Sequence, residues 1–262
     1  MALKKLRFMW LNYFDSAIVT ANSEAADYPV EQLQNRWKTV CWRSVGVTIG
    51  KEIVANLGSP LEVQAFVLEN MNFTAGMTVE LGGHVGDPTG LAAGSTDYFH
   101  VITITAAMVT AKRVVYFPAP GCTHTWWRLL MSAGGGGLTY LEAGRIYLGP
   151  YFEPTRSYRT QWKRSPASDS VVSYSDGGQA SVTERPVFWV YDLPISIVGS
   201  GDELAYAAIN AACGIVTPLW ICLDSTDEIA RTVYGHFLEY IAFQSVIDGR
   251  LWETSLKFRE EL

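Results

Sequence analysis

The sequence predicts a mainly β protein that combines an antiparallel β-sandwich with a second β-sandwich or barrel carrying one packed α-helix. Aromatic residues make up 13% of the 262 residues, and aromatic side chains pack well on the half-buried surface of a sheet. Short segments of alternating apolar and polar residues recur along the chain, and turn residues separate them at close spacing. With 48% hydrophobic and 18% charged residues, the chain is long and apolar enough for two domains.

The first half of the chain is predicted to form a series of short strands. Residues 77–81 alternate apolar and polar side chains with the period of a half-buried strand, and Gly82-Gly83 marks a turn after them. Many short strands with turns at close spacing are typical of an antiparallel sandwich. A short helix is expected at 29–37, where Pro29 suits the first helical position and Glu31 the first turn. The expected strands are 3–14, 53–57, 63–68, 77–81, 100–105, 114–117 and 126–131.

A run of Pro and aromatic residues at 149–154 indicates a crossing between domains. The sequence therefore predicts one domain at 1–155 and another at 156–262, with the first strand open to pairing in either. The Ser-rich stretch 165–181 is expected to be a hairpin tip or a long loop. The expected strands of the second domain are 187–197, 219–223, 232–243 and 251–258.

The strongest helix signal in the chain lies at 201–213. Ser200 and Glu203 match a capping box, in which each side chain binds a backbone N–H that the first turn leaves free. Gly214 supplies the left-handed residue that ends many helices. Leu204, Ala208 and Ala211 form a stripe that we expect to pack on the sheet.

Composition argues against several classes of function. The net charge is −6 and the pI about 5.3, and no cluster of Lys and Arg resembles a phosphate-binding surface, so nucleic-acid binding is not expected. No segment approaches the ~20 apolar residues that span a bilayer, so no membrane insertion is expected. The four Cys lie among apolar residues without metal-ligand spacing and are expected to be buried thiols. They are Cys41, Cys122, Cys213 and Cys222.

Catalytic and metal-binding motifs are missing from the sequence. It contains no H-E-x-x-H, no G-x-S-x-G and no phosphate loop. His84 and His100 could approach across a hairpin, but ordinary surface histidines are the simpler interpretation. Nothing brings Glu142 and Glu153 together as the carboxylate pair of a glycosidase. We therefore expect no enzyme, no catalytic residue, no metal and no cofactor.

Aromatic residues supply the candidate contact sites. Four tryptophans could stack on sugars, or could instead lie in the core or at a subunit contact: Trp126, Trp127, Trp162 and Trp220. Because adjacent residues on a strand face opposite sides, only one of Trp126 and Trp127 need be a core residue. Segments 187–197 and 232–243 are apolar on both faces, and one helix covers only part of a sheet. We therefore expect neighbouring copies to cover the rest. The ring-interface candidates are Phe188, Trp189, Tyr191, Tyr234, Phe237 and Tyr240.

Residues 10–155 resemble a known family of domains. The run ANSEAADYPVEQL at 21–33 is followed by WRS at 42–44, IVANLG at 53–58 and LENMNFT at 68–74. This order is similar to discoidin-like, galactose-binding-type jelly rolls of tailed-phage tail proteins, and YLEAGRIYLGP at 140–150 resembles their closing strand. Asn56 stands where the pattern has Asp, and Gln32 where it has Asn, which weakens any claim to a preserved ligand or ion site.

The second half resembles the β-sandwich-plus-helix unit of phage distal tail proteins, through its element order and the final strand WETSLKFREE. The resemblance implies a structural virion protein of the tail tip or baseplate, assembled in the host cytoplasm. It would form a ring, sixfold in that family, that joins the tail tube to the hub and anchors peripheral baseplate or fibre proteins. The alternative is a tail-associated carbohydrate-binding module that contacts the host surface.

The resemblance also suggests a role for the Trp-Arg-Ser stretch. In such a jelly roll Trp42 would cover a sheet edge, while Arg43 and Ser44 would donate hydrogen bonds to loop carbonyls. The stretch is thus interpreted as scaffold, with contact between Arg43 and a partner or sugar as the alternative.

Overall fold

The computed structural model describes residues 5–48, 50–132, 137–158, 162–176, 178–198, 200–247 and 251–261. The protein is mainly β with antiparallel sheets, which confirms the predicted fold class. The chain divides into two units. We call residues 11–151 and 227–232 the jelly-roll unit, and residues 1–10, 152–226 and 233–262 the sheet–helix unit.

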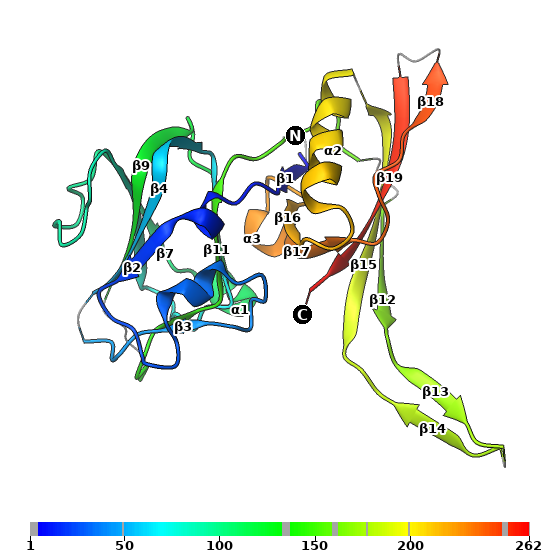
Figure 1. Cartoon of the computed structure of the whole chain (residues 1–262), viewed down its shortest axis with the longest axis horizontal. Helices are drawn as coiled ribbons and strands as arrows, with labels where there is room; N and C mark the ends of the chain where they lie inside the picture. Colours follow the sequence, from blue (N-terminus) through cyan, green and yellow to red (C-terminus); the bar gives the residue numbers. More distant parts are fainter. Residues whose placement is uncertain are drawn as a thin grey trace. The chain divides into compact units, whose positions relative to one another are not determined.

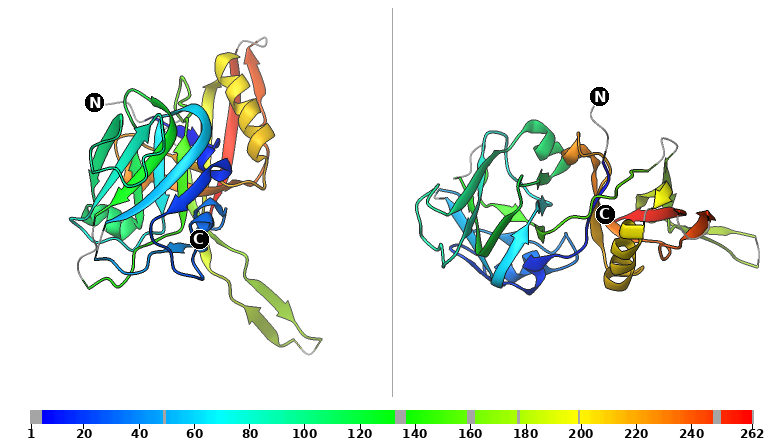
Figure 2. Two further views of the ribbon diagram at one scale, coloured as in Figure 1. Left: turned by 60° about the vertical axis from the view of Figure 1, so that its left-hand side comes forward. Right: turned by 90° about the horizontal axis from the view of Figure 1, so that it is seen from above.

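The jelly-roll unit is built from two facing sheets and a short strand pair (Figures 1 and 2). The larger sheet has the order β2 (Ile18–Ala21), β4 (Lys51–Val63), β9 (Cys122–Met131), β6 (Thr78–His84) and β7 (Tyr98–Thr103). The smaller sheet has the order β11 (Arg145–Gly149), β5 (Ala65–Glu69) and β8 (Arg113–Tyr116). The strand pair is β3 (Trp42–Arg43) with β10 (Glu142–Ala143). The short helices are η1 (Tyr13–Ser16), η2 (Val30–Gln34), α1 (Ala106–Ala111) and α3 (Glu228–Arg231).

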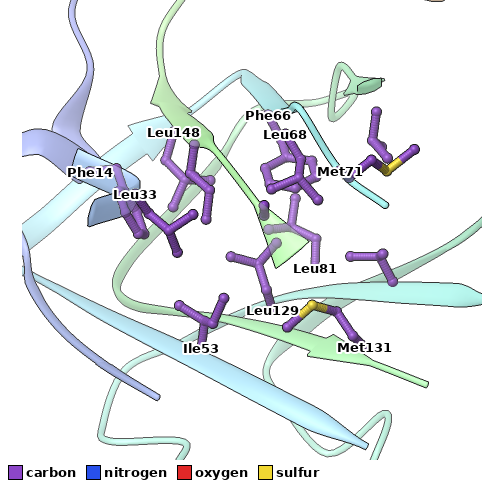
Figure 3. Packing of buried hydrophobic residues seen from close by; sticks show 14 of the residues in the cluster. Phe14, Leu33, Ile53, Phe66, Leu68, Met71, Leu81, Leu129, Met131 and Leu148 are labelled. Carbon is purple, nitrogen blue, oxygen red and sulfur yellow. The ribbon is translucent and has the colours of Figure 1, made fainter. Parts of the chain in front are cut away.

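The core of this unit lies between the two sheets (Figure 3). Leu129 of β9 faces Ile53 of β4 and Leu81 of β6 in register, so these side chains share one face of the larger sheet. Leu68 of β5 is opposite Ile146 of β11 on the smaller sheet. Period-two alternation therefore buries one face of each strand, as the sequence predicts.

A buried charge network lies on the other face of the larger sheet. Arg128 is fully buried; its Nη2 donates to Glu80 Oε1 at 2.7 Å, and its Nη1 lies 3.6 Å from Glu52 Oε1. The same guanidinium donates to the carbonyls of Leu91 and Ala92 at 2.7 and 3.2 Å. Backbone N–H groups of that loop donate to both carboxylates. The network thus fixes the loop between β6 and β7 on the sheet.

Several element predictions for this half of the chain need correction. Segment 29–37 forms only η2, with Pro29 as its N-cap rather than its first residue. Residues 3 and 4 of the strand expected at 3–14 lie outside the described residues, and the rest forms only β1 (Arg7–Met9), because the side chain of Asn12 accepts from Phe14 N and starts η1. Gly82 and Gly83 lie inside β6 and not in a turn. A Cβ on Gly82 would lie 2.6 Å from Thr96 Oγ1, so the close loop requires glycine there.

The sheet–helix unit contains one sheet of seven strands and a separate two-stranded ribbon in the described part of the chain. The sheet order is β1, β16 (Leu219–Cys222), β17 (Thr232–Phe237), β19 (Leu251–Glu260), β15 (Val187–Val198) and β12 (Lys163–Ser168), and β18 (Gln244–Ile247) also pairs with β19. The strand expected at 232–243 therefore ends at Phe237. The layer that covers this sheet is α2 (Ser200–Cys213), rather than a second sheet.

Helix α2 packs with a different stripe from the predicted one. Tyr206, Ile209 and Cys213 are buried and share a hydrophobic cluster with sheet residues such as Leu193 and Leu256. By contrast, Leu204 is 74% exposed, and the predicted stripe with Ala208 and Ala211 faces away from the sheet. The larger side chains bury more apolar area, so they decide the packed face.

The sequence predicts how α2 begins and how it ends. Gly214 has φ +52° and its N–H donates to Asn210 O at 2.9 Å, as expected of a left-handed exit. The predicted cap by the Ser200 side chain lies outside the described side chains.

The Ser-rich stretch forms a hairpin. β13 (Val171–Tyr174) pairs with β14 (Ala180–Thr183) as a two-stranded ribbon, which we call the arm. The arm continues from β12 and β15 away from the sheet (Figure 1). All its strand residues are exposed, including apolar side chains on both faces of the ribbon.

Candidate functional site

A partly exposed polar site on the jelly-roll unit surrounds Arg43. Arg43 pairs with Glu142 across β3 and β10, and its Nε donates to Glu142 Oε2 at 2.5 Å. Its Cζ lies 4.0 Å from the ring centroid of Tyr28 and 4.9 Å from that of Tyr140. We call these four residues the Arg43 cluster.

The local backbone explains how the cluster is held. Trp42 points inward, is fully buried and donates from Nε1 to Ser23 O at 3.1 Å, so the next residue, Arg43, points outward. Asn72 binds the neighbouring strand twice: its Oδ1 accepts from Glu142 N at 2.8 Å, and its Nδ2 donates to Tyr140 O at 3.0 Å. Side-chain hydrogen bonds to the backbone therefore position two of the three partners of Arg43, Glu142 and Tyr140.

The electrostatics of the cluster keep the guanidinium charged and partly available. The hydrogen bond to Glu142 raises the pKa of Arg43. The Arg43 side chain is 30% exposed, against 18% for Glu142. Nε is the guanidinium nitrogen bonded to Glu142, and the nearby Cys41 thiol interacts with both Arg43 and Glu142. The two Nη groups carry four N–H groups in all, beside a carboxylate and two aromatic rings.

The predicted roles of this stretch are thus only partly realised. Ser44 Oγ donates to a loop carbonyl, Gly46 O, at 2.8 Å, as expected. The side chain of Arg43 binds a carboxylate instead of loop carbonyls, because β10 brings Glu142 opposite it. Trp42 is a core residue and not a cover for a sheet edge.

Of the adjacent tryptophans, only Trp126 is open to a contact. Trp127 is fully buried, and its ring meets Tyr98 and His124 with centroids 6.1 and 5.8 Å apart. The prediction of a sugar contact is therefore wrong for Trp127, because its strand parity turns it into the core. Trp126 is half-buried on the other face, between His84 and Asn56 in register.

Trp162 belongs to the sheet–helix unit, where it joins two ring-interface candidates in an aromatic strip. Its ring is stacked on Tyr191 with centroids 6.3 Å apart. Arg164 Cζ lies 4.0 Å from the ring centroid of Trp189 and 5.5 Å from that of Tyr191. Trp162 and Trp189 are half-buried, so part of the strip remains accessible.

Most ring-interface candidates are buried within the chain. Phe237 is fully buried against Phe258, and Tyr234 is 1% exposed beside Trp220, so neither presents a surface to a neighbour. Phe188 and Tyr191 are also buried. Trp189 is half-buried and Tyr240 is 62% exposed, so these two of the six candidates remain accessible.

The histidines do not form a pair. His84 Nδ1 lies 2.8 Å from Asp97 Oδ2, whereas the ring of His100 stacks on Tyr116 at 4.0 Å. In the described ranges, no group of three or more His, Cys, Asp or Glu side chains could hold a metal ion. None of the described helices has the length and apolarity that a bilayer-spanning segment needs.

Sequence reasoning missed the partners of Arg43. Tyr28 and Tyr140 lie in the segments that carry the family resemblance, but their spacing gives no sign that they meet. Glu142 was considered only with Glu153, which binds Arg7 in the other unit at 3.0 Å. The pairing of β3 with β10, which brings Arg43 and Glu142 together, depends on the fold.

Comparisons with known proteins find likeness only among solved structures. No protein-family model and no curated protein matches the chain. Chitosan-binding module 1 of a chitosanase/glucanase from Paenibacillus sp. IK-5 is 16% identical, with 53% of this chain and 99% of that chain covered and a TM-score of 0.40. The fucose binding module SpX-3 of Streptococcus pneumoniae is 8% identical, with 54% and 99% covered and a TM-score of 0.41. The lectin domain of lectinolysin, complexed with Lewis B antigen, is 10% identical, with 53% and 95% covered and a TM-score of 0.40. Likenesses this slight carry no argument about ligand or activity.

Proposed function

We propose that the jelly-roll unit recognises glycans through the Arg43 cluster. The observation that carries the proposal is the fixed guanidinium: aromatic rings and a carboxylate orient Arg43, whose side chain stays 30% exposed. A guanidinium held in this way loses little rotamer freedom when it binds a ligand.

The hydrogen-bonding groups of the cluster favour a neutral sugar. The charges of Arg43 and Glu142 balance each other, so the site does not require a charged ligand. Each hydroxyl of a vicinal diol both donates and accepts. The Nη groups supply donors, the second oxygen of Glu142 an acceptor, and Tyr28 and Tyr140 apolar edges against which C–H groups of a pyranose can pack.

The test is a glycan array probed with the full chain, followed by calorimetric titration of any glycan that is retained. Arg43→Met keeps the apolar stem and should weaken binding at least tenfold, since hydrogen bonds from a charged group contribute ~1.5–3 kcal/mol. Arg164→Met is the matched control, because Arg164 also lies over aromatic rings but in the other unit. Thermal melting must show that both variants are folded. An array without a retained glycan, or equal affinities for Arg43→Met and the wild type, would contradict the proposal.

We also propose that copies of the chain assemble into a ring through the sheet–helix unit, as a structural component of a phage tail tip. The sequence resemblance to distal tail proteins supports this role, with the tail tube, the hub and peripheral baseplate or fibre proteins as further partners. The arm supports self-association: an isolated two-stranded ribbon is only marginally stable in water, yet Val172 and Val182 face each other on it, 50% and 56% exposed.

Native mass spectrometry and sedimentation equilibrium would test assembly directly. A closed ring should give one species whose mass is a fixed multiple of the 29.0 kDa chain mass. The resemblance to distal tail proteins implies six copies. A chain that remains monomeric up to its solubility limit would contradict the second proposal. It would leave the first intact, because glycan recognition is assigned to the jelly-roll unit.

A further inference from the structure

Trp37 is the tryptophan of this chain that is most open to water. It is 51% exposed, whereas the other eight of the nine Trp are buried or half-buried. Among the described residues its indole Nε1 has no hydrogen-bond partner, and Arg36 lies over its ring with Cζ 5.0 Å from the centroid. Since a tryptophan couples a large apolar ring to one N–H donor, an exposed one is well suited to contact a ligand.

The loop that carries Trp37 lies beside the Arg43 cluster. It connects η2 to β3, and its Lys38 carbonyl accepts from Asn70 Nδ2 at 3.0 Å. The same carbonyl lies against the Cα of Gly144, which follows Glu142 by two residues. At ~3.3 Å per residue of strand and ~3.8 Å between neighbouring Cα atoms, the backbones of Trp37 and Glu142 lie within about 15 Å of each other.

Hydrogen bonds fix the turn around Trp37. Trp37 N donates to Asn35 Oδ1 at 2.9 Å, and Trp37 O accepts from Val40 N at 3.0 Å. Because the neighbouring Lys38 carbonyl is bound as well, the backbone on both sides of the indole is held. A ligand that contacts Trp37 therefore has mainly side-chain rotamers to order, which keeps the entropic cost of binding low.

The surroundings of Trp37 favour a sugar over a protein partner. The residues that flank it in the loop are polar: Asn35, Arg36, Lys38 and Thr39. A protein interface has an apolar core of several side chains, and one indole among polar residues does not supply it. A sugar needs less, because one aromatic face can pack against the C–H groups of a pyranose while the hydroxyls bind polar neighbours.

A single sugar at the Arg43 cluster would leave Trp37 unused. The Arg43 guanidinium contacts the rings of Tyr28 and Tyr140, whereas the Trp37 ring contacts Arg36 and neither tyrosine in the described part of the chain. A ligand that touches both places is therefore longer than one pyranose.

We propose that Trp37 is a second sugar subsite, which stacks on a further residue of the glycan that the Arg43 cluster binds. The jelly-roll unit then takes a neutral oligosaccharide in preference to a single sugar. This inference rests on the proposed glycan recognition and names the substrate class of the same site.

Affinity as a function of sugar chain length tests the second subsite. The probes are cello-, chito-, galacto- and manno-oligosaccharides from one to four sugars long, together with any glycan retained on the array and its component monosaccharides. NMR titration of the full chain measures binding at each length. The wild type should bind the tetrasaccharide of the series that it recognises about tenfold more tightly than the monosaccharide, because Trp side chains often dominate the binding energy of a contact.

Trp37→Ala should remove most of this gain and leave the affinity for the monosaccharide as in the wild type. Trp37→Phe keeps an aromatic face and should keep most of the gain, whereas Arg43→Met should weaken binding at every length. Phe99→Ala is the matched control: Phe99 is also 51% exposed, on β7 of the same unit, and its replacement should change no affinity. Circular dichroism must show that all variants are folded.

The outcomes separate this inference from the proposal on which it rests. If Trp37→Ala binds every length as the wild type does, or loses the same factor at every length, the second subsite is overturned while glycan recognition by the Arg43 cluster stands. If Arg43→Met binds every length as the wild type does, or if no sugar of any length binds, both are overturned.

Discussion

At the scale of single residues, Arg128 is a fully buried charge in the jelly-roll unit. Its side chain is 0% exposed, and the two carboxyl side chains beside it are each 7% exposed. Both carboxylates are out of water, so the guanidinium is their main compensation together with loop N–H groups. Removal of one member of such a buried set leaves charge uncompensated.

Arg128→Met should therefore destabilise the unit by ~3–5 kcal/mol. Urea denaturation followed by tryptophan fluorescence measures the change, since Trp127 lies in the same strand within the core. Arg231→Met is the control: Arg231 is 45% exposed in an i, i+4 pair with Asp227 at 3.8 Å, and exposed pairs contribute ~1 kcal/mol or less. Equal losses for both variants would show that Arg128 does not carry a buried charge network.

Glu153 gives a pH-dependent prediction for the sheet–helix unit. Burial acts to raise the pKa of Glu153, but hydrogen bonds from Lys5 and Arg7 outweigh it, so the pKa is lowered from 4.5. A carboxyl whose pKa is depressed in the folded state stabilises that state above the unfolded pKa and loses this contribution as the pH falls. The free energy of unfolding should decline below about pH 4.5, less steeply in Glu153→Gln than in the wild type. Parallel pH profiles for the two proteins would refute the assignment.

At the scale of elements, α2 provides a direct comparison between its two faces. Ile209 is fully buried and Leu204 is 74% exposed on the same helix. Ile209→Ala should cost ~2–5 kcal/mol through lost burial and a cavity, whereas Leu204→Ala should change stability by less than about 0.5 kcal/mol. Chemical denaturation of both variants checks this. A larger loss of stability in Leu204→Ala than in Ile209→Ala would show that the helix packs with the face that contains Leu204, as the sequence suggests.

The range of α2 was predictable from its sequence, but its packed face was not. Gly214 marks the end of the helix by its own chemistry, independently of the rest of the fold. The packed face is ambiguous because alanines make both stripes apolar, and only contact with the sheet selects Tyr206, Ile209 and Cys213. Likewise, η2 shows that a favourable Pro and Glu do not by themselves sustain a long helix: the segment ends at Gln34, although Val30 and Leu33 are buried.

Strand pairing explains why the sequence alone predicts only part of the Arg43 cluster. The alternation that turns Trp42 inward and Arg43 outward is a property of two adjacent residues. The contact between Arg43 and Glu142 joins positions 99 residues apart, and no local pattern specifies it.

At the scale of the whole molecule, the two units have separate cores. The hydrophobic cluster of the jelly-roll unit includes Leu129 and Ile53, that of the sheet–helix unit includes Ile209 and Leu256, and the two clusters share no residue. Differential scanning calorimetry should therefore resolve two transitions. Arg128→Met should lower one of them and Ile209→Ala the other. A single transition lowered by either substitution would show that the two cores unfold as one.

Because β1 pairs with β16, it cannot join its sheet until most of the chain has been synthesised. Arg7 faces Cys222, so the first strand of the sheet–helix unit leaves the ribosome about two hundred residues before its neighbour exists. At ~5–20 residues per second, that delay is roughly ten to forty seconds. The jelly-roll strands are all made within this interval, whereas α3, which completes that unit, follows β16. During the wait Phe8, fully buried in the finished protein, has no β16 to pair with, and a chaperone that binds short apolar segments would find a target in β1 of the growing chain.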